Sequence, residues 1–339
     1  MNEFIDESIK LFLNRNGWDD ALVEPIKSDA SFRNYYRIRK KNLTSILMDT
    51  SRSSEKIEKF IEVSKLLNNF GLSAPNCLAT DFKTGYSLLE DFGENSFNNE
   101  ILNGKNPLIL YEKAVDVLVH IKKQSVSKNF QKFDTKRMLE EVSLFIDWTL
   151  PSITGYKVDN INKSEFLLLW KNVLTELEDY KNTLVLFDYH VDNLMWLNSR
   201  KGIKKVGLLD FQDALLGPSE YDLVSILEDA RRDVEQEIVE EMIRRYLFFC
   251  PEKKNTFNKN YSILGAQRNT RILGVFVRLF IRDNKSNYLT FMPRVWDLLE
   301  KDLQHPVLSK LHKWYNKNVS KSIRTKEYKK HISVNRELR

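Results

Sequence analysis

The feature that most constrains this chain is a segment, 184–222, in which short apolar runs alternate with turn-forming residues and end on oxygen-bearing side chains. Asp188 closes the first apolar run, and Asn193 comes five residues later, directly before the second. A turn-rich stretch, 198–202, then leads into a third run that ends on Asp210. Apolar runs on either side of turn formers predict a β-hairpin. Because hairpin arms run antiparallel, we expect Asn193 and Asp210 side by side at its open end, with Asp188 just upstream.

This grouping of two carboxylates and an amide fits phosphoryl transfer from a nucleotide. In that reaction one carboxylate accepts the proton of the attacking hydroxyl, and a second carboxylate and an amide oxygen hold magnesium against the phosphates. Mg²⁺ is a hard cation that prefers oxygen ligands. The protein-kinase signature has the same order and spacing. We therefore predict Asp188 as the catalytic base and Asn193 and Asp210 as the magnesium ligands.

Two other interpretations of this segment are weaker. An Asp at a strand end is often only a turn former, but that does not account for all three residues at this spacing. His190 and Asp192 look like half of an iron site made of two His and one carboxylate. Such a site needs a second His from a distant part of the chain, and only His120, His305, His312 and His331 remain. A lone His beside acids is more often structural or in contact with substrate, and His120, on a predicted helix, is better explained by packing or a surface position.

Composition indicates an ordinary globular protein of one large or two moderate domains, because 42% of its 339 residues are hydrophobic and 29% are charged. No apolar run approaches the ~20 residues of a membrane span. The acidic start lacks the basic region of a signal peptide, and the two cysteines form no motif. We therefore expect a cytoplasmic protein with no membrane span.

The net charge of +6 has a local source at the C-terminal end. Residues 313–339 contain nine Lys or Arg and two Glu, and the rest of the chain is nearly neutral. No nucleic-acid motif accompanies this charge. We expect a solvated basic tail and no specific nucleic-acid partner.

The order of the predicted elements indicates two parts. The first part has expected helices over 3–16 and 55–70, the latter ended by Gly71, and expected strands at 32–38, 44–48 and 86–89. The second part has expected helices at 110–123, 136–148, 165–177, 225–229, 234–249, 261–280 and 294–303. This order predicts an α+β, bilobal, protein-kinase-like fold, with a small β-rich N-lobe at 1–93, a larger, mostly helical C-lobe with the hairpin at 94–312, and a basic tail at 313–339.

A run of small residues, Ser28 to Ser31, precedes the strand at 32–38. Small residues in a hairpin let backbone N–H groups approach phosphates. Glycine is usual in such loops, so the local pattern alone favours an ordinary surface hairpin.

Longer motifs carry a resemblance to a known superfamily. The segments are SDASFRNYYRI at 28–38, LLEDFG at 88–93, DYHVDNLMW at 188–196, GLLDFQDALLGPSEYDLVSILEDARRD at 207–233 and QRNTRILGVFVRLFIRDNK at 267–285. With them the chain resembles the aminoglycoside phosphotransferase and choline kinase superfamily over nearly its whole length. The pattern DFQDA…GP…YDLVS is similar to the branch of anomeric amino-sugar kinases that phosphorylate N-acetylmuramate and N-acetylglucosamine at C1 during cell-wall recycling.

The resemblance implies ATP and Mg²⁺ as cofactors and a small-molecule substrate. It implies nucleotide-binding residues in a phosphate-covering loop, on the third strand and at a hinge, namely Ser28, Asp29, Ala30, Ser31, Phe32, Arg33, Met48, Glu90, Asp91 and Phe92. It also implies that Asp222 braces the catalytic loop through its backbone, a role compatible with capping the next helix. The expected substrate contacts are His190, Asp192, Gln212 and Arg278, although His190 and Asp192 could equally brace the loop.

Two positions depart from the superfamily pattern. The His that usually stands two residues before the catalytic Asp is Leu186 here. The Lys that usually grips the phosphates from the third strand is missing, because the matching strand reads Leu47-Met48-Asp49. Arg33 is our candidate replacement, since Arg meets phosphate oxygens in a fork.

Three functions therefore stay open at this stage. The first is an amino-sugar kinase, the second is an aminoglycoside or choline-type kinase with another pocket, and the third is a pseudokinase that binds ATP without catalysis. The missing Lys favours the pseudokinase, and the intact Asp188, Asn193 and Asp210 oppose it. Four arginines favour a neutral or anionic sugar over a polycation: Arg268, Arg271, Arg278 and Arg282. The oligomeric state is left open.

Overall fold

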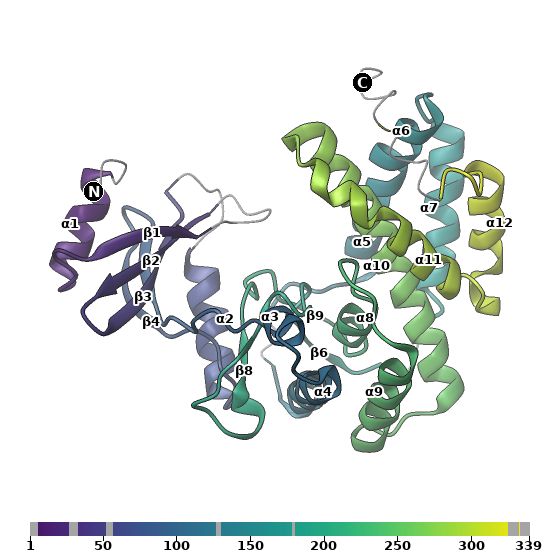
Figure 1. The fold of residues 1–339 in the computed structure, drawn as a ribbon. Coiled ribbons are helices and arrows are strands. Elements are labelled where there is room, and N and C mark those ends of the chain that lie inside the picture. The colour runs from purple at the N-terminus through teal and green to yellow at the C-terminus, as the bar shows by residue number, and fades with distance from the viewer. Residues whose placement is uncertain are drawn as a thin grey trace. The chain divides into compact units, whose positions relative to one another are not determined.

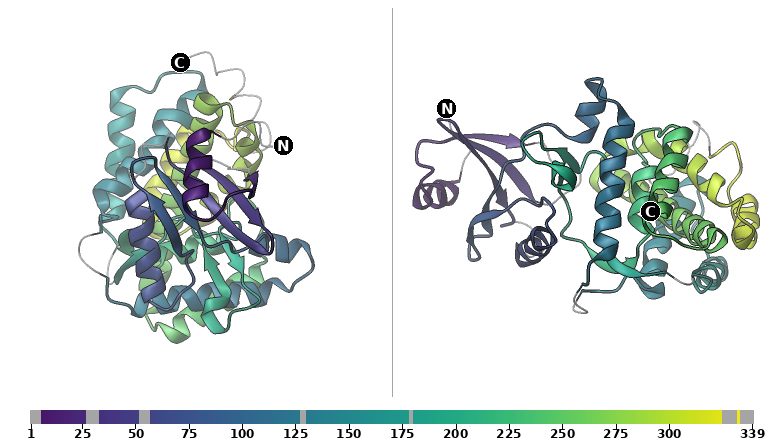
Figure 2. Two further views of the ribbon diagram at one scale, coloured as in Figure 1. Left: turned by 90° about the vertical axis from the view of Figure 1, so that its left-hand side faces the viewer. Right: turned by 90° about the horizontal axis from the view of Figure 1, so that it is seen from below.

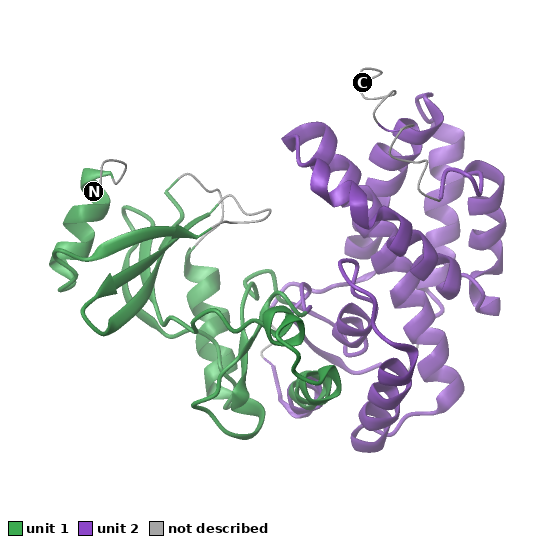
Figure 3. Ribbon diagram, in the orientation of Figure 1, with its two compact units in different colours: residues 1–117, 191–214 green, residues 118–190, 215–339 purple. Residues whose placement is uncertain are grey.

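The chain forms two compact units. The computed structural model describes residues 6–26, 33–51, 57–126, 130–177, 180–324 and 332. Unit 1 comprises residues 1–117 and 191–214, and unit 2 comprises residues 118–190 and 215–339 (Figure 3). A β-sheet with many helices confirms the predicted α+β class.

These units do not coincide with the lobes expected from the sequence. Residues 94–117 and the hairpin segment 191–214 pack with the N-terminal part. The predicted lobes were defined by the order of the expected helices and strands, and their limits at residues 93 and 312 stay a prediction.

An antiparallel sheet of five strands is the centre of unit 1, with strand order β1-β2-β3-β5-β4 (Figure 1). Its strands are β1 (Leu22–Ile26), β2 (Asn34–Lys40), β3 (Leu43–Asp49), β4 (Cys77–Asp81) and β5 (Tyr86–Leu89). Helix α1 (Glu7–Arg15) begins after Asp6, whose carboxylate accepts a hydrogen bond from the Ser8 amide (3.0 Å). The apolar side of α1 packs with buried residues of the sheet. The strands expected at 32–38, 44–48 and 86–89 are thus confirmed within the described residues.

The remaining elements of unit 1 are helices and a short hairpin. They are α2 (Ile57–Asn69), α3 (Phe97–Leu102), the first part of α4 (Pro107–Lys123), β7 (Leu194–Trp196), a 3₁₀ turn (Gly202–Lys205) and β8 (Val206–Leu208). Gly71 follows α2 with a φ of +76°, which confirms the left-handed end predicted for this helix.

Helices form most of unit 2, and α10 (Lys254–Asp283) is the longest of those described (Figures 1 and 2). The others are α5 (Thr135–Leu144), α6 (Leu150–Thr154), α7 (Asn160–Leu174), α8 (Tyr221–Leu227), α9 (Gln236–Phe249), α11 (Met292–Asp302) and α12 (Ser309–Asn318). Short 3₁₀ turns at Ser286–Phe291 and Pro306–Leu308 flank α11. The strands β6 (Asn182–Val185) and β9 (Leu215–Pro218) pair antiparallel. One apolar core runs through α5, α7, α10, α11 and α12.

One expected helix changes type before it ends. The sequence predicts a continuous helix over 136–148, but α5 ends at Leu144 and a π-helix follows at Phe145–Thr149. This junction lies against α10. There the Thr149 hydroxyl donates a hydrogen bond to the Leu273 carbonyl (2.9 Å), and Gly274 leaves room for the backbone of Leu144 and Phe145.

The expectation of a solvated tail is wrong for its first part. Trp314, Tyr315, Val319 and Ile332 are buried members of the unit 2 core. Arg324 donates hydrogen bonds to Glu300 (2.8 Å) and to the Val319 carbonyl (2.9 Å). Among the helices of the described ranges, none is long and apolar enough to cross a bilayer.

Candidate active site

The predicted hairpin is present in unit 1. Strands β7 and β8 pair antiparallel with Leu194 opposite Leu208. The Leu209 amide donates a hydrogen bond to the Asn193 carbonyl (3.0 Å), which extends the ladder by one residue. Asn193 and Asp210 therefore lie at the same open end of the hairpin, as the sequence predicts.

Asp210 has an unusual backbone conformation. Its φ is +56°, in the left-handed region that non-glycine residues rarely adopt. Phe211 holds the following segment in the core of unit 1, since it is fully buried and stacks on Phe60 of α2 with ring centroids 5.0 Å apart. The Gln212 side-chain amide donates a hydrogen bond to Asp210 Oδ1 (2.9 Å). Unfavourable backbone of this kind persists where surrounding contacts enforce it, and it clusters at functional sites.

Asp188 lies in unit 2, directly after a second residue of this kind. Phe187 has a φ of +76°, and its ring stacks on Tyr221 with centroids 5.5 Å apart. The Asp222 carboxylate accepts hydrogen bonds from the backbone amides of Leu186 (2.6 Å) and Phe187 (3.0 Å). Complete burial raises the pKa of Asp222 to about 7, against the effect of those two amides. The loop before Asp188 is thus held through its backbone by Asp222 and through the Phe187 ring by Tyr221.

Asp188 lies beside an ion pair of unit 2, formed by Arg271 and Glu141. The Arg271 guanidinium, on α10, lies 3.9 Å from Asp188 Oδ1 and donates a hydrogen bond to Glu141 Oε2 on α5 (2.9 Å). It also lies over the Phe187 ring, 4.2 Å from its centroid. Burial alone would lower the pKa of Arg271, but Tyr221, Asp188 and Glu141 together raise it, so this side chain stays cationic. Sequence reasoning missed Glu141, because no local signal connects residues so far apart in the chain.

The other expected substrate residues are divided between the two units. His190, in unit 2, is buried, and burial with the nearby Arg231 and Arg268 lowers the pKa of its imidazole well below the ordinary value. It is therefore neutral. Asp192 and Gln212 belong to unit 1.

Across the ranges that the structure describes, no three His, Cys, Asp or Glu side chains lie close enough to hold a metal ion.

The structure describes only some of the residues expected to bind the nucleotide. Ser28, Asp29, Ala30, Ser31 and Phe32 lie outside the described residues. Arg33 is 2% exposed, and its guanidinium is 3.5 Å from the Tyr35 hydroxyl. Met48 is fully buried in β3.

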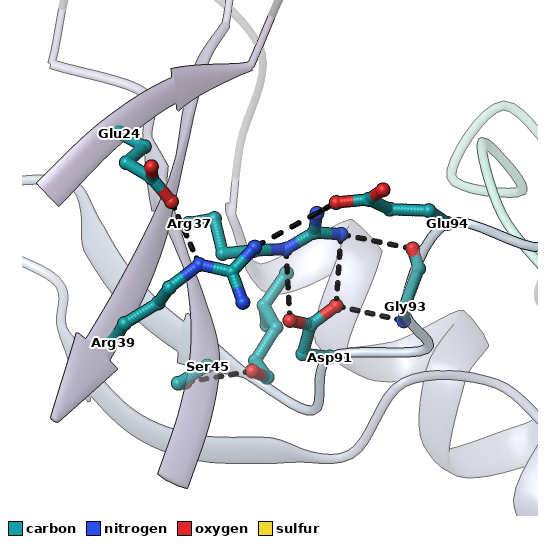
Figure 4. A network of polar contacts seen from close by, with 8 residues as sticks. Glu24, Arg37, Arg39, Ser45, Asp91, Gly93 and Glu94 are labelled. Carbon is teal, nitrogen blue, oxygen red and sulfur yellow. Dashed lines mark hydrogen bonds and ion pairs between the residues drawn. The ribbon is translucent and has the colours of Figure 1, made fainter. Parts of the chain in front are cut away.

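The expected hinge, Glu90 to Phe92, is held by its own side chains. The Asp91 carboxylate pairs with Arg37 of β2 through bonds of 2.9 and 3.2 Å and accepts a bond from the Gly93 amide (2.8 Å), as Figure 4 shows.

Glu90 and Phe92 also have partners in unit 1. Glu90 pairs with Arg200 and accepts a hydrogen bond from Asn76 Nδ2 (2.8 Å). The Phe92 ring fills the space that a side chain at Gly207 would need, since an added Cβ there would lie 2.7 Å from it. The side chains of this bend thus have partners within unit 1, and the Glu90 amide donates a hydrogen bond to the Asn76 carbonyl (2.9 Å).

Comparison with known proteins agrees with this geometry. The model of the family described as "APH: Phosphotransferase enzyme family" matches residues 22–255. A protein of Caulobacter vibrioides named N-acetylmuramate/N-acetylglucosamine kinase is 32% identical, over 91% of this chain and 95% of its own length. A protein of the same name from Pseudomonas aeruginosa is 30% identical, over 88% of this chain and 90% of its own.

Solved structures show the same fold at low sequence identity. The ADP-bound aminoglycoside phosphotransferase APH(2'')-Ib has a TM-score of 0.61 and 14% identity, covering 90% of this chain and 99% of its own. A choline/ethanolamine kinase family protein of Mesorhizobium loti has a TM-score of 0.59 and 12% identity, covering 94% and 93%. These likenesses confirm the expected kinase-like fold.

Proposed function

Because the chain belongs to the phosphotransferase enzyme family and is a kinase, we propose that it transfers the γ-phosphoryl group of ATP to the anomeric hydroxyl of an amino sugar, N-acetylmuramate or N-acetylglucosamine. One observation carries the choice of acceptor: relatives that align along nine-tenths of this chain bear that name. The Asp188 loop braced by Asp222 supports the choice of chemistry.

Asp188 is the proposed base that orients the sugar hydroxyl and accepts its proton. An anomeric hydroxyl is a hemiacetal group and more acidic than an ordinary alcohol, so a carboxylate is basic enough. Asp222 would keep the loop in place by accepting its two backbone amides. Arg271 lies close to Asp188 in the same unit and would hold the carboxylate in an orientation suited to this task.

Asn193 and Asp210 would hold Mg²⁺. Their donor set fits that ion, since one carboxylate and one amide oxygen at one hairpin end are hard oxygen ligands. When bound, the ion would neutralise charge on the phosphate oxygens. The Gln212 amide, bonded to Asp210 Oδ1, would keep that carboxylate in one orientation.

The proposed nucleotide site combines the segment Ser28 to Arg33, Met48, and the bend at Glu90 to Phe92, where backbone groups would pair with adenine. The buried Arg33 would have to turn outward to replace the missing Lys. His190, Asp192 and Gln212 are proposed to meet sugar hydroxyls or the acetamide. ATP and a recycled sugar are available together in the cytoplasm, so we propose that location.

The test is to identify the product. Purified protein with ATP, Mg²⁺ and either sugar should yield an acid-labile 1-phosphate, seen by phosphorus NMR, and omission of Mg²⁺ should stop the reaction. A parallel panel would contain choline, homoserine and aminoglycosides. A 6-phosphate product, or turnover of choline or an aminoglycoside with neither sugar consumed, would contradict the amino-sugar assignment and leave the kinase assignment intact.

A further inference from the structure

Four arginines on α10 have different surroundings in the structure. Arg268 is buried and donates hydrogen bonds to Ser225 Oγ (3.1 Å) and the Glu228 carbonyl (2.9 Å). Arg282 forms two bonds of 2.8 Å with Asp283, its neighbour in sequence. Both guanidinium groups therefore have partners that explain them as parts of the fold.

Arg271 and Arg278 lie nearer to the proposed chemistry. Arg271 connects Glu141 with Asp188. Arg278 follows it by seven residues, two helical turns, on the same face of α10 and roughly 10 Å along the axis. This face of the helix thus extends from the proposed base to Arg278 within one unit.

Arg278 differs from the other three because a nitrogen of its guanidinium group is buried without a hydrogen-bond partner. No carboxylate of the described residues forms an ion pair with it, and its Nε is buried with no hydrogen-bond acceptor there. Burial, together with Arg282 and Arg271, lowers the pKa of the Arg278 guanidinium, although Glu141 and Asp283 oppose this. A buried donor without an acceptor costs free energy, and a bound anion would remove that cost.

We propose that Arg278 binds the carboxylate of an acidic amino sugar, such as the lactyl group of N-acetylmuramate, and so sets the preference for acidic over neutral acceptors. This inference rests on the proposed function. The lactyl group of N-acetylmuramate is carried on O3, two ring carbons from the anomeric carbon. Since Arg278 lies roughly 10 Å along α10 from Arg271, a sugar with its anomeric hydroxyl at Asp188 could extend this carboxylate toward Arg278. The guanidinium fork matches a carboxylate in two parallel hydrogen bonds. The Arg278 guanidinium would also repel the ammonium groups of a polycationic aminoglycoside.

The test is the selectivity of Arg278→Met, which keeps an apolar side chain and removes the charge. The ratio of kcat/KM for N-acetylmuramate to kcat/KM for N-acetylglucosamine should fall about 10- to 100-fold, the range of one charged hydrogen bond. Turnover of the neutral sugar by the variant reports that it is folded. The matched control is Arg282→Met, four residues further along the helix and already paired with Asp283, which should leave the ratio at the wild-type level.

The experiment distinguishes a failure of the role proposed for Arg278 from a failure of the proposed function. An unchanged ratio, whether both activities fall together or neither changes, overturns the role of Arg278 alone. A raised KM for ATP with an unchanged sugar ratio assigns Arg278 to a phosphate and also overturns it. A wild-type protein that phosphorylates neither sugar overturns the proposed function and this inference with it.

Discussion

At the scale of single residues, two left-handed non-glycine positions belong to the proposed catalytic machinery: Phe187, directly before Asp188, and Asp210 itself. Three other such positions, Asp20, Lys41 and Asn284, are found in turns or at a helix end, where this conformation is common. This explanation does not apply to Phe187 and Asp210. The backbone conformation of each costs on the order of 1–3 kcal/mol. Asp222 offsets this cost at Phe187 through two backbone bonds. These bonds and the stacking of Phe187 on Tyr221 hold the loop in this conformation despite its cost.

Asp188→Asn should lower kcat by about 10²- to 10⁴-fold, because the amide cannot accept the proton of the sugar hydroxyl. Nucleotide binding, measured with a fluorescent ATP analogue, should persist. Asp19→Asn is a matched control, since that exposed carboxylate pairs with Lys40 (2.8 Å) in another part of the fold. A variant at position 188 that keeps more than a tenth of the wild-type rate would remove Asp188 from this role.

Asp222 predicts a pH dependence of stability. Its pKa is about 7 in the folded protein, because burial raises it from the ordinary aspartate value of 3.8. A raised folded pKa means that the native state binds a proton more tightly than the unfolded state, so this contribution is complete below about pH 4 and is lost as the pH rises to about 7. This contribution to the free energy of unfolding can be measured by urea unfolding of the wild type and of Asp222→Asn at pH 5, 6, 7 and 8. The wild type should lose stability relative to the variant up to about pH 7 and no further, and a constant difference would be incompatible with the raised pKa.

At the scale of elements, sequence reasoning recovers local features and misses those set by distant contacts. The hairpin that holds Asn193 and Asp210 is visible because its arms and its turn are adjacent in sequence. Strands β1 and β4 are missed from the sequence, since β1 contains Pro25 and β4 is short and shows no alternation of buried and exposed residues. The π-helix after Leu144 depends on its contact with α10. The contacts of Arg271 with Glu141 and Asp188 also could not be predicted, because they join residues far apart in the sequence.

Gly274 is the residue at which α10 meets the start of the π-helix. A Cβ at this position would lie 2.5 Å from the Leu144 carbonyl carbon and 2.6 Å from the Phe145 nitrogen, both of them backbone atoms. Gly274→Ala should therefore reduce the free energy of unfolding by about 1–3 kcal/mol, even though Ala favours helices by about 1 kcal/mol. Urea unfolding measures this free energy for the wild type and for Gly274→Ala. The control is Ser262→Ala, a change in the same helix. A stabilised Gly274→Ala protein would mean that the two backbones do not approach so closely.

At the scale of the whole molecule, the C-terminal segment belongs to the core of unit 2. The sequence suggests a detachable basic end, because charge dominates residues 313–339. Tyr315 contradicts this: it is fully buried, its hydroxyl hydrogen-bonds with Thr270 (2.8 Å), and its ring contacts Phe145 and Phe166. A few aromatic residues among many lysines decide the packing, since burial of one such side chain outweighs several solvated charges.

A chain that ends at Trp314 should therefore lose its cooperative thermal transition or show a much lower Tm. It lacks the core residues Tyr315, Val319 and Ile332. A chain that ends at Ile332 keeps them and should melt like the wild type. Tyr315→Ala in the full-length protein separates packing from charge, because it leaves every basic residue in place and should cost roughly 3–5 kcal/mol. If instead the chain ending at Trp314 melts normally and Tyr315→Ala costs nothing, this segment does not stabilise unit 2. A kinase whose terminal segment completes its core would also lose activity on removal of that segment through unfolding, without any residue of the segment touching the substrate.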